Sequence, residues 1–238
     1  MVSATDHPER IPMKRTLLRC RIVLPFLLVL LCWSQAWANP GEPASVAIKT
    51  LAVMPFAAAD KPLDKRKNIE DYVDCKLFGL CSWKKEESGA DTVTTAYQQQ
   101  LRKKLGHKLL PPLQTEAVFA ELPPQPEETL RTAAIRFGKE TMASHVLTGT
   151  VWRYKDRVGT PMAVEKPASV GFNVILVRTR DGAILWHDHF DRTQTSLSDN
   201  LLDAPLFVTK GMKWVSAAEL ASFGVEKTLR GFPALREQ

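Results

Sequence analysis

The sequence predicts an α/β (α+β) fold: a single small domain in which a mixed sheet carries helices packed on its faces. One indication is an early apolar strand at 45–56, followed by segments with helical periodicity. Another is a set of late strand-like runs at 145–154, 169–178 and 183–192, rich in β-branched and aromatic residues. The composition, 45% hydrophobic and 24% charged, is typical of a soluble globular protein. An early buried strand, then helices, then antiparallel strands indicate a mixed sheet covered by helices.

The N-terminal region has the pattern of a cleaved secretory signal. A basic segment around Lys14 and Arg15 precedes an uninterrupted apolar run at 22–33, and small residues stand at Ala36 and Ala38. The run has about a dozen residues, whereas a transmembrane helix needs about twenty. We therefore expect cleavage after Ala38 and export of the mature chain.

This assignment divides the chain into three parts. We expect residues 1–38 to be the cleaved signal peptide, 39–44 a flexible leader, and 45–238 the single α/β domain. The stretch before the basic segment is unusually long for a signal peptide, so Met13 is an alternative start. Five basic and two acidic residues fall within 1–38, which leaves +3 of the net charge of +6 on the mature chain. That surplus is not clustered, which disfavours a nucleic-acid partner.

The cysteines raise two questions, whether the chain is lipidated and whether the mature chain contains a disulfide. Lipidation of Cys32 is the less favoured alternative to cleavage, because Leu31 precedes it where lipoprotein processing requires a small residue. The mature chain would retain only Cys75 and Cys81. Outside the cytoplasm a disulfide is the natural use of such a pair. Free thiols are the alternative, and a zinc site would need more ligands.

The first half of the domain predicts two strands, a long excursion and three helices. Pro55 ends the strand at 45–56, and the charged segment 57–89 carries the cysteine pair without sustained periodicity. Asp91 is the expected N-cap of a helix that ends at Gly106. Its inward stripe comprises Val93, Tyr97, Leu101 and Leu105.

A short strand at 109–110 and a small helix at 114–122 are expected next. A helix opening at Pro126 should then follow. Its expected inward face comprises Leu130, Ala133, Ala134, Phe137 and Met142.

The second half predicts three strands and a final helix. Asp181-Gly182 between two strand-like runs is a strong hairpin signal. The final helix should span 216–229, with Ser216 and Glu219 forming a capping box.

Two strands and one hairpin resemble a known group of bacterial envelope proteins. The stretch 51–56 (LAVMPF) resembles the group's opening strand followed by Pro-Phe, and 145–151 (HVLTGTV) resembles its later glycine-containing strand. The hairpin through Asp181-Gly182 resembles its last paired strands. The group comprises the curli-secretion lipoprotein, the activator lipoproteins of penicillin-binding proteins and the amino-terminal domain of TolB. The resemblance covers residues 45–192 and implies an anticodon-binding-domain-like fold and a periplasmic scaffold or assembly role.

The most metal-like cluster is His187, His189 and Asp191, which would share one face of the strand 183–192. Two histidines and a carboxylate can hold a transition metal. We favour the other interpretation, a solvated face of an edge hairpin. The sequence contains neither a G-x-S-x-G nucleophile elbow nor a glycine-rich phosphate loop. We therefore predict no catalytic residue, no cofactor and no resident metal.

The interaction prediction rests on the excursion, which the disulfide would constrain. The expected recognition residues are Tyr72, Leu77, Phe78, Leu80 and Trp83. Further aromatic residues could serve an interface, although core packing is the more frequent role for each of them. They are Trp152, Tyr154, Trp186, Phe207, Trp214 and Phe223.

Taken together, these patterns predict a non-enzymatic periplasmic or outer-membrane-associated protein that assembles or regulates other components by docking. Its partner would be another envelope protein, and a homo-oligomer is compatible with that role. One alternative is a subunit of an outer-membrane secretion channel. The other is a metal-dependent hydrolase that uses His187, His189 and Asp191.

Overall fold

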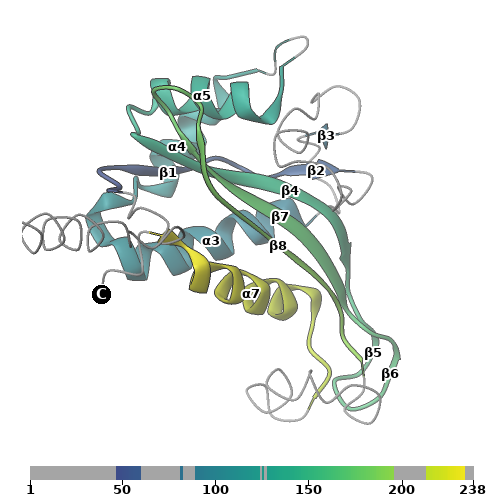
Figure 1. Cartoon of the computed structure of the whole chain (residues 1–238). Helices are drawn as coiled ribbons and strands as arrows, with labels where there is room; N and C mark the ends of the chain where they lie inside the picture. The colour runs from purple at the N-terminus through teal and green to yellow at the C-terminus, as the bar shows by residue number, and fades with distance from the viewer. Residues whose placement is uncertain are drawn as a thin grey trace, which may run out of the picture. The chain divides into compact units, whose positions relative to one another are not determined.

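A mixed sheet with a helical layer on each face forms the fold (Figure 1). The computed structural model describes residues 47–59, 81–82, 89–123, 125, 128–195 and 213–233, all within the unit Ser45–Gln238. The strands of the sheet are β1 (Leu51–Val53), β2 (Ala57–Ala59), β3 (Cys81–Ser82), β4 (His145–Lys155), β7 (Ser169–Arg178) and β8 (Ile184–Thr193). The helices are α3 (Ala90–Leu105), α4 (Pro112–Ala120), α5 (Leu130–Glu140) and α7 (Ala217–Thr228), with short 3₁₀ turns η1 (Gly106–Lys108) and η3 (Leu229–Gly231). The predicted fold class is confirmed.

The sheet combines parallel and antiparallel pairs in the order β3-β2-β4-β7-β8, with β1 also pairing β4. β1 and β2 both run parallel to β4, whereas β4–β7, β7–β8 and β2–β3 are antiparallel. α3 and α7 pack against one face and enclose a core that includes Tyr97, Phe172 and Leu220. α4 and α5 pack against the other face, around Met54, Phe137 and Ile175.

The strand predicted at 45–56 is shorter than expected and continues after a break. β1 ends at Val53 and β2 resumes at Ala57, inside the range predicted as the excursion. Pro55 lacks an N–H, and its neighbours find partners elsewhere. Met54 N–H donates to the Leu147 carbonyl at 2.9 Å, and Phe56 N–H donates to Thr94 Oγ1 at 3.0 Å. The break turns Phe56 into the core, where its ring stacks on Tyr97.

α3 confirms the predicted stripe but not the predicted cap. The four stripe residues are buried and the helix ends at Gly106 as expected. The N-cap is Gly89, at φ +68°, and Asp91 lies in the first turn. A Cβ on Gly89 would lie 2.1 Å from the Tyr154 ring, so the close approach of that ring and the positive φ both favour glycine.

The next two helices shift against their predicted bounds. α4 begins at Pro112, and Leu109 bridges Leu51 as the predicted short strand. α5 begins at Leu130 rather than Pro126, because Thr129 caps it in a reciprocal pair with Thr132. The predicted inward face is buried except at Met142.

The Met142 prediction is wrong. Its side chain is 83% exposed and its backbone has φ +53°. The N–H of Met142 donates to Lys139 and that of Ala143 to Gly138, which together form the Schellman ending of α5. The helix therefore ends at Glu140, two residues before the predicted inward face ends, and Met142 occupies the left-handed position that follows.

The late strands and the final helix agree with the sequence. The β7–β8 hairpin turns at Asp181-Gly182, with Gly182 at φ +71°. Arg178 Nε donates to Asp181 Oδ1 at 2.9 Å and holds the pKa of that carboxyl well below its usual range. Ser216 and Glu219 form the predicted capping box of α7. A small ribbon of β5 (Val158–Gly159) and β6 (Val164–Lys166) between β4 and β7 was not predicted, and neither was β3.

Candidate docking surfaces

Several of the predicted site residues lie outside the described residues. These are Ala38, Tyr72, Cys75, Leu77, Phe78, Leu80 and Trp83. The backbone of Cys81 begins β3, opposite Ala59 of β2. The disulfide, the cleavage site and the recognition loop therefore stay predictions.

The three metal-like residues share one face of β8, as the sequence predicted. His187, His189 and Asp191 are all exposed, and the intervening Asp188 and Phe190 lie on the α7 face. Strand residues four positions apart are separated by about 13 Å, too far for three side chains of one strand to converge easily on an ion. Asp191 instead forms an ion pair with Arg153 of β4. Among the described residues, no group of three or more His, Cys, Asp or Glu side chains could hold a metal.

A serine and a histidine also meet at the start of β4. Ser144 Oγ lies 2.9 Å from His145 Nδ1 and donates its hydrogen to the Thr50 carbonyl at 2.7 Å. Since the hydroxyl has one hydrogen, Nδ1 must be the donor in the Ser144–His145 bond. His145 is only 6% exposed, and its burial lowers its pKa. The positive charge of Arg178 lowers this pKa further. The Ser144–His145 pair therefore ties the start of β4 to Thr50, the residue before β1. It does not form a nucleophile and its base.

Most of the aromatic residues considered for an interface contribute to packing. Tyr154, Trp186 and Phe223 pack against the core that α3 and α7 enclose. The Trp186 ring meets Phe232 edge to face at 5.2 Å. Trp152 lies on the opposite face, over Gly171. Phe207 lies outside the described residues.

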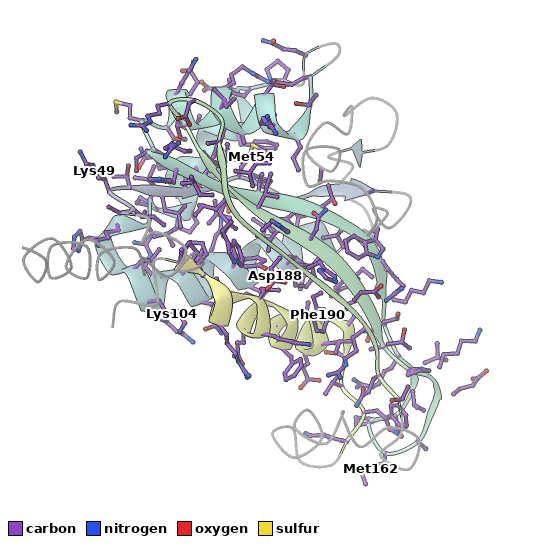
Figure 2. The ribbon with its side chains drawn as sticks, in the orientation of Figure 1. Lys49, Met54, Lys104, Met162, Asp188 and Phe190 are labelled. Atoms are coloured by element: carbon purple, nitrogen blue, oxygen red, sulfur yellow. The ribbon has the colours of Figure 1, made fainter. Side chains whose placement is uncertain are left out.

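The β5–β6 ribbon presents apolar side chains to solvent. We call residues 156–166 the arm. Met162 is 81% exposed and Val158 47%, and Pro161 and Ala163 are also exposed. Met162 lies at the tip, beyond the helical layers (Figure 2).

Hydrogen bonds join the arm to the residues that lead into α7 and to the first residue of that helix. The Pro161 carbonyl accepts from Trp214 N–H at 2.8 Å, and Asp156 Oδ1 accepts from Ala217 N–H at 2.9 Å. Gln194, fully buried, accepts from Val215 N–H at 2.9 Å and ties the same segment to the sheet. The arm is thus held both at Asp156, where it begins, and at Pro161, next to Met162.

The second surface is the outer edge of β8. Within the described residues β8 pairs with β7 and with no other strand. An edge strand carries backbone N–H and C=O groups that can pair with another chain. No helix in the described part of the chain is long and apolar enough to cross a membrane.

The fold and these surfaces describe a small α/β domain with exposed elements suited to contacts with other macromolecules. No family model and no curated protein matches the sequence. Solved structures are similar in fold. The PelC dodecamer structure from Paraburkholderia phytofirmans has 14% identity and a TM-score of 0.45, over 83% of this chain and 96% of that one.

Two further structures extend this comparison. Lipoprotein GNA1162 from Neisseria meningitidis has 15% identity and a TM-score of 0.40, over 68% of this chain and 93% of that one. The LpoB C-terminal domain from Salmonella enterica has 14% identity and a TM-score of 0.33, over 63% and 87%.

Proposed function

We propose that this protein is a non-enzymatic assembly or regulatory component of the bacterial envelope that docks onto another envelope protein through its arm. The observation that carries the proposal is the exposure of Met162 and Val158 on a ribbon that the rest of the domain holds in place. Folding of the domain gives no reason to expose a methionine at the end of such a ribbon. A flexible, polarizable thioether adapts well to a partner surface.

The anchoring of the arm favours binding over mere surface exposure. A loop that must be ordered on binding loses conformational entropy, whereas a pre-organised one loses less. The contacts at Pro161 and Asp156 supply this order in advance. A small apolar tip of this kind can act as an anchor in the centre of an interface.

The remaining parts of the proposal concern export. Removal of residues 1–38 would deliver the domain to the periplasm, where it could also associate with the outer membrane. A disulfide between Cys75 and Cys81 would constrain the recognition residues between β2 and α3 and add a second contact. N-terminal sequencing of the exported protein should begin at Asn39.

Site-specific photo-crosslinking in intact cells tests the docking role. A photoreactive residue at Met162 should give an adduct with another envelope protein. Met142 offers a matched control, because it is an equally exposed methionine beyond the other end of β4. Absence of an adduct at Met162, or equal adducts at both positions, would contradict the proposal.

The same purified protein separates the alternatives. A requirement for detergent to stay in solution would favour the channel subunit. Bound metal that is lost in the variant His187→Ala/His189→Ala would favour the hydrolase. Either result would replace the docking role proposed here.

A further inference from the structure

The outer edge of β8 carries opposite charges in a symmetric arrangement. Phe190 stands at the centre, with His189 and Asp191 one position away on either side and Asp188 and Arg192 two positions away. Asp188 and Phe190 lie on the α7 face of the sheet (Figure 2), and Arg192 shares that face by alternation. His189 and Asp191 lie on the other face. Each face therefore has an acid on one side of Phe190 and a basic or hydrogen-bond-donating residue on the other.

We propose that two copies of this chain pair their β8 strands antiparallel, about a two-fold axis at Phe190. In that register, Asp188 lies opposite Arg192 of the second copy, and His189 lies opposite the second copy's Asp191. The symmetry doubles each contact, which gives four complementary side-chain pairs. Pairing over seven residues would add about six to eight backbone hydrogen bonds.

Neighbouring registers are less favourable. An axis at Asp188 would place that carboxylate opposite its own copy, and cross-strand like charges are destabilising. An axis at His189 would place Asp188 opposite Phe190 and Arg192 opposite Trp186. The axis at Phe190 also leaves out Leu185, where the β7–β8 register shifts. The charge pattern and the bulge select the same register.

Charges on an edge strand often serve to prevent pairing. Here their positions discourage most registers but complement one of them. Asp188 forms no ion pair within the described part of the chain. Its Oδ1 accepts from the His189 N–H at 2.7 Å, and its Oδ2 is the oxygen that it offers to Arg192 of the second copy. Asp191 Oδ1 binds Arg153, and its Oδ2 is available to an imidazole N–H.

Charge reversal combined with sedimentation measurements tests the proposal. Wild-type protein should form a dimer. Asp188→Arg and Arg192→Asp should each weaken it by roughly tenfold or more, because like charges then meet twice. The double variant Asp188→Arg/Arg192→Asp should restore the dimer, since it exchanges the two charges without changing the register. Arg180→Asp is the control, because Arg180 is exposed on the β7–β8 turn and lies outside the proposed contact.

Restoration by the double variant is the decisive result, because misfolding of either single variant cannot produce it. Near-ultraviolet circular dichroism of each variant confirms that the domain has folded. A monomeric wild type, or an assembly that the single reversals leave unchanged, would overturn the pairing. So would failure of the folded double variant to dimerise. These measurements do not involve the arm, so they stand or fall separately from the crosslinking at Met162.

Discussion

The end of α5 offers a test in which removing a side chain should stabilise the protein. Met142 takes the left-handed position of the Schellman motif, where glycine is preferred. An L-residue in that region costs about 1–2 kcal/mol. Glycine recovers this cost but loses about 0.5–1 kcal/mol through the greater freedom of the unfolded chain. Because the side chain is 83% exposed, its removal forfeits little packing, and Met142→Gly should gain about 0.5–1 kcal/mol.

Urea unfolding followed by circular dichroism measures this gain as a higher midpoint at unchanged slope. Met142→Ala is the matched control. It removes the same exposed chain but keeps the Cβ, so its stability should stay within about 0.5 kcal/mol of the wild type. A glycine variant no more stable than the alanine variant would refute the assignment of backbone strain to Met142.

Three other measurements address the core. Gly224→Ala should destabilise the domain by about 1–2 kcal/mol despite the higher helix propensity of alanine, because the added Cβ would lie 2.6 Å from the Phe190 ring; a midpoint equal to wild type would count against this close packing. Burial lowers the pKa of His145 in the folded protein, so the unfolded chain takes up the proton first as the pH falls. The free energy of unfolding should therefore be highest above the ordinary histidine pKa of 6.5 and should decline below it. The variant His145→Gln should flatten this decline between pH 7 and pH 5. Tyr97→Phe should cost about 1 kcal/mol, because it removes the buried 2.7 Å hydrogen bond to Thr228; no change in midpoint would show that this bond contributes nothing.

Periodicity predicted those parts of the fold that depend on local pattern. In α3, burial of Val93, Tyr97 and Leu101 follows directly from their four-residue spacing. The β7–β8 turn follows from Asp181-Gly182, because Gly182 takes the left-handed backbone, at φ +71°, that closes the loop 179–182. Such features require no knowledge of the rest of the chain.

The errors arose where a distant residue decides the local structure. Pro55 indicates the end of a strand, yet Thr94 and Leu147 supply the hydrogen bonds that let β2 resume beside β4. Asp91 is a good N-cap by type, but the ring of Tyr154 and the turn of the chain favour glycine at position 89. Neither contact is visible in a window of local sequence.

The candidate surfaces were only partly predictable for the same reason. Alternation along β8 correctly predicted that His187, His189 and Asp191 share a face. It could not show that Asp191 pairs with Arg153, which lies two strands away in the sheet. The charge symmetry around Phe190 can be read in the sequence, but it acquires meaning only when β8 is known to lie at an edge.

The proposed dimer axis should depend on core packing, because Phe190 lies both at the axis and in the hydrophobic core. Phe190 is 3% exposed and its ring lies 5.5 Å from Phe172, while α7 approaches it closely at Gly224. The packing that fixes the Phe190 ring therefore also fixes the positions of the flanking charged side chains along the edge of β8. Gly224→Ala displaces the ring and should weaken both unfolding stability and dimer formation, whereas Met142→Gly should raise stability and leave the dimer unchanged. If Gly224→Ala lowers the urea midpoint but sediments like the wild type, the axis does not lie at Phe190.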